Sequence, residues 1–262
     1  RLAYSNNSGT SWTLDPDSTT GDAINFVAAA IDSKNRIHVA HASSDAVFYD
    51  LASPSYGGDS TIDDITISGN LTIFLVTKHQ PISANVIILH DDFPAVIFST
   101  STTNPAAASS VWFKRCISGG GRTTLNCDDA TTNWCNAANT NCTTGAAGAD
   151  RLHNSGTNLI NFAPTMAQVP SVASTEVNRI YAYFSQSGST ALRRVVASCS
   201  DCAASPPTWS WGAVVTQDSS TVSSTRYGDI DVIADSTNNR IVFNWASTNT
   251  TDCGAATTYC LV

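Results

Sequence analysis

Apolar residues in this chain occur in short runs separated by polar turns, and one such pattern recurs. The runs Phe26–Ile31, Met166–Val172 and Ile230–Ala234 are each followed by a turn rich in Asp, Ser, Thr or Asn and then by a second apolar run. Short apolar runs bounded by such turns predict β-strands, and two in succession predict a β-hairpin. Asp and Asn favour the turn because their side chains hydrogen-bond to nearby backbone groups.

The turns themselves are similar in sequence. Segment 32–39 (DSKNRIHV) matches 235–242 (DSTNNRIV) with one inserted residue, and 174–181 (STEVNRIY) is a third copy. A more divergent copy is 86–98, where the turn reads Asp-Asp-Phe-Pro. Repeats of about 60 residues leave room for four strands each, which is typical of propeller blades. No helical period separates the strands, which argues against an α/β fold.

Further apolar runs at 46–51, 111–115 and 191–197 predict a third strand after each of three hairpins. We therefore expect an all-β fold, a β-propeller-like array of about four blades of antiparallel strands with disulfide-stapled loops. The whole chain, 1–262, is expected to form one domain. The predicted repeat units are 21–66, 67–155, 156–220 and 221–262, the last completed by 1–20.

The N-terminal residues are predicted to complete the last unit. Residues 1–5 resemble a third strand and 11–14 a fourth, while the final unit lacks a recognisable fourth strand. Two arrangements satisfy this expectation. The strands pair within the same molecule and close a ring, or they pair with a neighbour and give a head-to-tail polymer by strand exchange.

Composition narrows the class of protein. Of 21 acidic side chains Glu176 is the only glutamate, which leaves 20 aspartates, and aspartate favours turns over helices. The net charge of −8 argues against nucleic acid as a partner, because phosphate binding needs a basic face. No apolar run approaches the roughly 18 residues of a membrane span. Low charge with abundant Ser, Thr, Asn and Gly is typical of secreted or cell-surface β-proteins.

The segment after Leu2-Ala3-Tyr4 resembles the Asp-box of the BNR-repeat, sialidase-like β-propellers, whose pattern is S-x-D-x-G-x-T-W. Asn7 stands where that family usually has aspartate. The resemblance implies a turn between the third and fourth strands of a blade, with Gly at positive φ and Trp packed between blades. This box is structural in that family. The matching positions are Ser5, Asn7, Gly9, Ser11 and Trp12.

The catalytic residues of that family are not evident here. A sialidase needs an arginine triad, a Tyr–Glu nucleophile pair and an acidic Asp, yet Glu176 lies inside a repeat turn. Arg36, Arg179 and Arg240 occupy the same position in three repeats. They would bind an anionic ligand together only if those turns face a common axis; otherwise they are structural.

The sequence gives little support for a metal-binding site. Asp91-Asp92 and Asp128-Asp129 are pairs of carboxylates that would suit calcium if they are not simply solvated turn residues. His38 and His41 are three apart on a strand, so they point to opposite faces and cannot share a metal ion. We expect no zinc and no organic cofactor.

The eight cysteines predict disulfides, because their number is even and the composition is that of a secreted protein. They fall as neighbours in the sequence, and sequential pairing closes four short loops within single units. Cys199-Ser200-Asp201-Cys202 lacks the helix of a redox site and the second C-x-x-C of a zinc site. The predicted pairs are Cys116–Cys127, Cys135–Cys142, Cys199–Cys202 and Cys253–Cys260.

These features predict a non-enzymatic extracellular module, structural or adhesive, and a candidate subunit of a head-to-tail fibre. The alternatives are a sialidase-like glycoside hydrolase and a carbohydrate-binding propeller, so glycans are candidate partners. N-glycosylation sequons add a glycoprotein to the expectations. They begin at Asn6, Asn70, Asn141 and Asn249.

Overall fold

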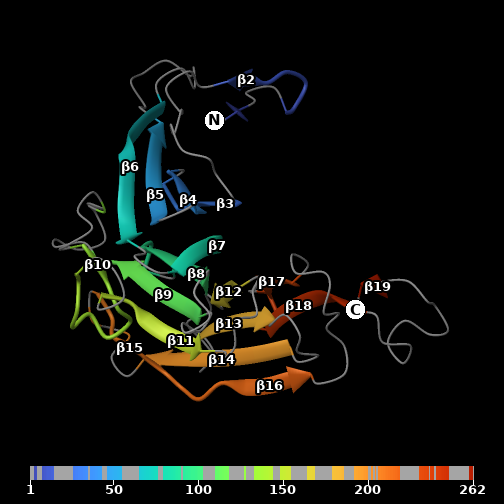
Figure 1. Cartoon of the computed structure of the whole chain (residues 1–262). Helices are drawn as coiled ribbons and strands as arrows, with labels where there is room; N and C mark the ends of the chain where they lie inside the picture. The colour runs from blue at the N-terminus through green and yellow to red at the C-terminus, as the bar shows by residue number, and fades with distance from the viewer. Residues whose placement is uncertain are drawn as a thin grey trace.

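The computed structural model shows a chain built from β-strands (Figure 1). Among the residues that it describes there is no α-helix, and none of them belongs to a helix able to cross a membrane. The described residues are 3–4, 8–14, 26–34, 36–42, 46–54, 65–75, 79–89, 91–102, 110–117, 127, 133–143, 148–154, 164–168, 179–185, 192–199, 202, 204, 206–218, 230–235, 237–238, 240–247 and 260–261.

Sheets 1 and 2 come first along the chain. Sheet 1 has the strand order β3-β4-β5-β6, and sheet 2 has the order β7-β8-β9-β10 with β11 also paired to β9. All pairs are antiparallel. The strands are β3 (Phe26–Ile31), β4 (Ile37–Ala42), β5 (Ala46–Pro54), β6 (Ile65–Leu75), β7 (His79–Ile88), β8 (Pro94–Thr102), β9 (Ser110–Cys116), β10 (Trp134–Cys135) and β11 (Asp150–Asn154).

Sheets 3 and 4 repeat the antiparallel plan. Sheet 3 has the order β12-β13-β14-β15, with β16 also on β14, and sheet 4 has the order β17-β18-β19. Their strands are β12 (Thr165–Gln168), β13 (Arg179–Ser185), β14 (Leu192–Cys199), β15 (Trp209–Trp211), β16 (Val215–Asp218), β17 (Ile230–Asp235), β18 (Arg240–Ser247) and β19 (Cys260–Leu261).

The sheets pack face to face in chain order, and the two faces of each strand serve different neighbours. We call the face toward the preceding sheet the front and the face toward the following sheet the back. In β8, Val96 and Phe98 belong to the core with sheet 1, whereas Ala95 and Ile97 belong to the core with sheet 3. Successive side chains of a strand point to opposite faces, so one strand supplies both cores.

The same division holds in sheet 3. Ile180 and Ala182 of β13 face sheet 2, while Tyr181 and Tyr183 face Val232 of sheet 4. Strands β3, β7, β12 and β17 lead their sheets and contact one another in that order. Burial on both faces explains why these strands read as continuous apolar runs and not as an alternating pattern.

The all-β expectation and the predicted hairpins agree with this structure. β3 pairs with β4, β7 with β8, β12 with β13 and β17 with β18. The first sheet extends beyond the predicted unit boundary at 66, because β6 (Ile65–Leu75) pairs with β5. The described strands do not form a closed ring: Figure 1 shows sheet 4 (red) and sheet 1 (blue to cyan) as the two ends of the described series.

The N-terminal hairpin bears on two expectations. β1 (Ala3–Tyr4) pairs with β2 (Thr13–Leu14), and among the described strands neither pairs with sheet 4. Completion of the last unit by residues 1–20 stays a prediction, because part of both segments lies outside the described residues. Gly9 has the expected positive φ of 83°. Trp12, expected between blades, is 66% exposed.

Disulfides close short loops on sheets 2 and 3. The structure contains Cys116–Cys127, Cys135–Cys142 and Cys199–Cys202, which are three of the four predicted pairs. The first two anchor β9 and β10, which carry the fully buried Cys116 and Cys135. The fourth predicted pair involves Cys253, which lies outside the described residues.

Candidate functional site

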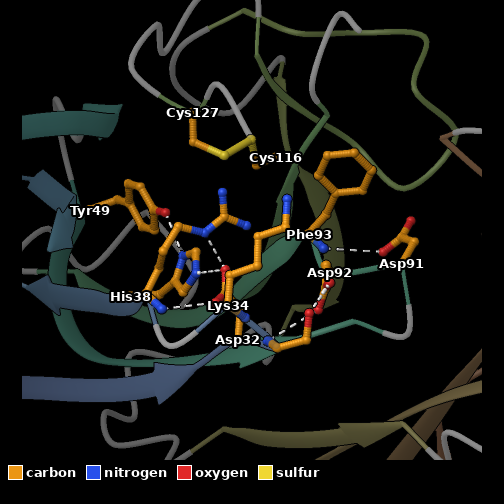
Figure 2. A network of polar contacts seen from close by, with 11 residues as sticks. Asp32, Lys34, His38, Tyr49, Asp91, Asp92, Phe93, Cys116 and Cys127 are labelled. Atoms are coloured by element: carbon orange, nitrogen blue, oxygen red, sulfur yellow. Dashed lines mark hydrogen bonds and ion pairs between the residues drawn. A yellow bond between two sulfur atoms is a disulfide. The ribbon is translucent and has the colours of Figure 1, made fainter. Parts of the chain in front are cut away.

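Polar side chains gather at the hairpin turns where sheet 1 meets sheet 2 (Figure 2). Asp32 follows β3 directly and is 5% exposed. Its Oδ1 accepts hydrogen bonds from the backbone N–H groups of Lys34 and Arg36, each at 2.9 Å, and its Oδ2 accepts one from Arg36 Nε. The first aspartate of the repeat thus organises the turn that the sequence assigned to it.

A chain of hydrogen bonds continues from this turn into the core. His38 Nε2 lies 3.1 Å from Asp32 Oδ2, and His38 Nδ1 lies 2.7 Å from the hydroxyl of Tyr49. A neutral imidazole satisfies both contacts when Nε2–H donates to the carboxylate and the tyrosine O–H donates to Nδ1. Tyr49 in turn packs edge-on against Trp134 of sheet 2, with ring centroids 4.7 Å apart.

Burial and hydrogen bonding set the charges of this chain. Burial favours the neutral acid, but the donors around Asp32 outweigh it and hold the pKa of its carboxyl below the usual value. Burial lowers the pKa of His38 even though Asp32 opposes the shift, so the ring is neutral at pH 7. Burial also raises the pKa of Tyr49. The result is one carboxylate that faces a neutral imidazole and a neutral phenol.

Hydrogen bonds join the β3–β4 turn of sheet 1 to the β7–β8 turn of sheet 2. The backbone N–H of Ser33 lies 3.4 Å from Asp92 Oδ1, and its hydroxyl hydrogen-bonds to Asp92 Oδ2. Asp92 adopts φ 65°, a left-handed conformation that aspartate tolerates better than most residues. This conformation places its carboxylate toward the neighbouring turn, as Figure 2 shows.

A second set of hydrogen bonds joins sheet 2 to sheet 3. Arg115 of β9 is fully buried and donates from Nη2 to Asp91 Oδ2 at 2.8 Å and from Nη1 to the carbonyl oxygen of Pro207 at 3.0 Å. The guanidinium lies over the Phe93 ring, 5.8 Å from its centroid. Burial lowers the pKa of Arg115 from its high ordinary value, and the Asp91 carboxylate opposes that shift. Buried charges of this kind need full pairing.

Lys114 is the neighbour of Arg115 on β9 and points to the other face of the strand. It is fully buried, and its Nζ donates to the carbonyl oxygens of Ile73 at 3.1 Å and Thr143 at 2.9 Å. Burial lowers its pKa to about 8. The amine therefore ties β6 of sheet 1 to a loop of sheet 2.

The Asp32–His38–Tyr49 chain has the order of an acid–base relay, but these three side chains hydrogen-bond to one another. Both imidazole nitrogens are occupied, and His38 is 0% exposed. A substrate would have to displace Tyr49 from the core to reach the ring. The arrangement is suited to holding sheets together, with proton transfer to an outside molecule blocked by burial.

The three repeat arginines belong to three different sheets. Arg36 pairs with Asp32 and Arg240 pairs with Asp235, each within its own turn, the latter at 2.8 Å. Arg179 is the first residue of β13. Arg36 thus belongs to sheet 1, Arg179 to sheet 3 and Arg240 to sheet 4. The structure assigns Arg36 and Arg240 to turn stabilisation.

The remaining predicted sites are placed as follows. Asp91 and Asp92 point into separate contacts, with Arg115 and Ser33, and among the described residues no group of three His, Cys, Asp or Glu side chains is arranged to hold a metal ion. His38 and His41 face opposite sides of β4, and His41 Nε2 lies 3.2 Å from Asp50 on the front. Outside the described residues lie Ser5, Asn6, Asn7, Asp128, Asp129 and Asn249.

The other two sequons and the rest of the Asp-box are described. Asn70 lies on β6, and Asn141 Oδ1 accepts a hydrogen bond from the Thr143 hydroxyl at 3.0 Å, within its own sequon. Gly9 and Ser11 lie in the exposed loop between β1 and β2. Sequence reasoning missed the buried pair Lys114 and Arg115, although two cations inside the apolar run 111–116 are a signal of buried, partnered charge.

Comparison with known proteins adds no assignment. A scan against protein-family models finds none that matches this chain, and a search of curated proteins finds no match. What the structure itself defines is a class: an all-β protein of antiparallel sheets that stack face to face and are joined by hydrogen bonds between their turns and loops. The resemblance to Asp-box propellers stays a prediction.

The buried and exposed ion pairs should differ sharply in their contribution to stability. Asp91→Ala leaves Arg115 buried without its carboxylate and is expected to cost about 3–5 kcal/mol of unfolding free energy. Asp235→Ala breaks the pair with Arg240, whose side chain is 64% exposed, and should cost much less, because water screens an exposed ion pair. Urea denaturation measures both, with Asp91→Asn as an intermediate. Equal losses in the two alanine variants would contradict the fastening role.

The His38 network should make stability fall in mild acid. Because burial lowers the pKa of His38 in the folded state, the unfolded chain takes up a proton first, near its ordinary value of 6.5. The stabilisation is complete above that pH and is lost as pH falls from about 6.5 to the lowered pKa. Urea midpoints between pH 7.5 and 5.5 test this, and His38→Gln should flatten the slope. An unchanged slope in the variant would count against the network.

Proposed function

We propose that this protein is a non-enzymatic extracellular module, structural or adhesive, with a β-propeller-like array of about four sheets. In this proposal it is the subunit of a head-to-tail surface fibre. The observation that carries it is the mismatch between the two ends of the described chain. A sheet with an open edge lies at one end. At the other lies the two-stranded β1–β2 hairpin, which pairs with none of the other described strands.

The open edge runs along β18. β19 pairs only with Ala246 and Ser247, so among the described strands residues 240–245 of β18 have β17 on one side and no partner on the other. An open edge presents unpaired N–H and C=O groups and favours addition of a further strand. A neighbour's β1, laid beyond β19 along β18, would fill this edge, and its β2 would form the next strand.

Three properties of the chain support an extracellular structural role. The disulfides fit an oxidising compartment, where small loops are commonly stapled in this way. The buried cations Lys114 and Arg115 donate hydrogen bonds to carbonyl oxygens of Ile73 in sheet 1 and of Pro207 beside sheet 3. The exposed Trp12 on the free hairpin supplies an apolar group that a partner sheet would cover.

Deletion of residues 1–14 tests the proposal. We expect the full chain to form fibres visible by negative-stain electron microscopy and to sediment as polymers, and the deletion variant to remain monomeric. A synthetic peptide of residues 1–14 should block growth of the full chain by occupying the open edge. Trp12→Ala should weaken assembly without unfolding the chain, because the side chain is 66% exposed.

Three results would overturn the proposal. Assembly and melting temperature that are unaffected by the deletion would show that the hairpin pairs with nothing important. Robust turnover of fluorogenic glycosides, abolished by a single Asp→Asn substitution, would replace the structural role with that of a glycoside hydrolase. Binding on a glycan array by a catalytically silent, monomeric chain would replace it with that of a carbohydrate-binding protein.

A further inference from the structure

The three described disulfides differ in how far solvent reaches their sulfur atoms. Cys199–Cys202 is the one in which both cysteines are partly exposed. The pair Cys116–Cys127 is buried at both ends, and the pair Cys135–Cys142 is fully buried at Cys135. Thiol–disulfide exchange requires that an attacking thiolate reach a sulfur atom. Access therefore favours exchange at Cys199–Cys202 over the other two pairs.

The same pair closes the smallest loop. Its cysteines are 3 residues apart, against 7 for Cys135–Cys142 and 11 for Cys116–Cys127. In the chain-entropy account, a disulfide stabilises a protein by restricting the unfolded chain, and this effect grows with the size of the loop. The folded chain therefore loses least when Cys199–Cys202 opens. The disulfide that is easiest to reach is also the one that contributes least to stability.

The two sulfur atoms of this pair lie in different surroundings. Cys199 is the last residue of β14, is paired in register with Trp209 of β15, and packs against the core between sheets 2 and 3. Cys202 lies in the connection from β14 to β15 and is not among the described residues of that core. Cys202 Sγ is therefore the sulfur more open to attack.

We infer that Cys199–Cys202 is a thiol-exchange site, at which a low-molecular-weight thiol forms a mixed disulfide with Cys202. The thiolate attacks Cys202 Sγ, the S–S bond breaks, and its electron pair leaves with Cys199 Sγ, which takes up a proton. A second thiolate attacks the small-molecule sulfur of the mixed disulfide and releases Cys202, which is protonated in turn. Both cysteines are then reduced, and two small thiols have become one disulfide. The inference is independent of the fibre proposed above.

The connection that this bond closes also joins sheet 3 to sheet 2. The carbonyl oxygen of Pro207 accepts hydrogen bonds from Arg115 Nη1 at 3.0 Å and from Asn139 Nδ2 at 2.9 Å. Two residues further on, the backbone N–H of Trp209 donates to the carbonyl oxygen of Ala137 at 2.9 Å. Opening of the disulfide removes a constraint on this connection. We therefore expect reduction to loosen the contacts of residues 207–209 while the sheets stay folded.

Graded reduction of the intact, oxidised chain tests the site. The protein is incubated without denaturant in glutathione buffers of rising ratio of reduced to oxidised form, quenched with N-ethylmaleimide and mapped by tandem mass spectrometry. We expect glutathione on Cys202 and N-ethylmaleimide on Cys199 at a reduced-glutathione concentration at least about tenfold below that which opens the other pairs. Hydrogen exchange at that ratio should be faster at Trp209 than in the oxidised chain.

The matched control is the double variant Cys199→Ser with Cys202→Ser. It should fold, take up no glutathione at that ratio, and show the faster exchange at Trp209 without any thiol. A melting temperature far below that of the oxidised chain would contradict the small contribution of this disulfide to stability and would overturn the inference.

The mapping itself gives the remaining results that would overturn the inference. These are earlier or simultaneous opening of Cys116–Cys127 or Cys135–Cys142, and resistance of Cys199–Cys202 until urea unfolds the chain. Glutathione on Cys199 with N-ethylmaleimide on Cys202 would overturn the choice of Cys202 as the attacked sulfur. Unchanged hydrogen exchange at Trp209 in the reduced chain would overturn the link to the contact between sheets 2 and 3.

Discussion

Coverage of both faces of a sheet is the constraint on which the rest of this structure depends. Sheet 2 lies between two neighbours, so β8 sends Val96 and Phe98 into one core and Ile97 into the other, all at 0% exposure. A strand in this position has no solvent face for a charged side chain. Any charge on it must therefore find its partners inside the protein.

Strand β9 shows how that requirement is met and what it produces. Lys114 and Arg115 are consecutive, so they point into different interfaces. Lys114 donates a hydrogen bond to the carbonyl oxygen of Ile73 in sheet 1. Arg115 donates hydrogen bonds to Asp91 and to the carbonyl oxygen of Pro207 beside sheet 3. Two adjacent cations thus join three sheets. The Ser33–Asp92 contact and the packing of Tyr49 against Trp134 reinforce the first of these junctions.

Much of the architecture was predictable from the hairpin repeat, because Asp, Ser and Asn in the turns and the apolar runs beside them are local signals. The turn role of Asp32 and Asp235 and three disulfides follow from sequence neighbours alone. Strands β10 and β15 were missed, since two or three residues carry no period. The placement of Trp12 was wrong because it depends on a neighbouring sheet, and no local pattern reports whether that sheet is present.

The candidate site was less predictable, and the reason is physical. Arg36 and Arg240 share a repeat position, yet each is taken up by the aspartate of its own turn. The groups that join sheets, Asp92 and Arg115, come from a divergent repeat and from a third strand. Their contacts with Ser33 and with the Pro207 carbonyl oxygen span sequence separations of 59 and 92 residues. Contacts of this kind depend on how sheets stack, which the strand pattern by itself leaves open.

Amide hydrogen exchange of the monomeric chain, read by mass spectrometry, tests the central claim most directly. If coverage of both faces sets local stability, β8, β9 and β13 should exchange most slowly, while β3 and β17, which each have one open face, should exchange faster. Asp91→Ala should then speed exchange in sheets 2 and 3 together, since Arg115 joins them. Protection of β3 equal to that of β8, or a loss confined to one sheet, would contradict the account.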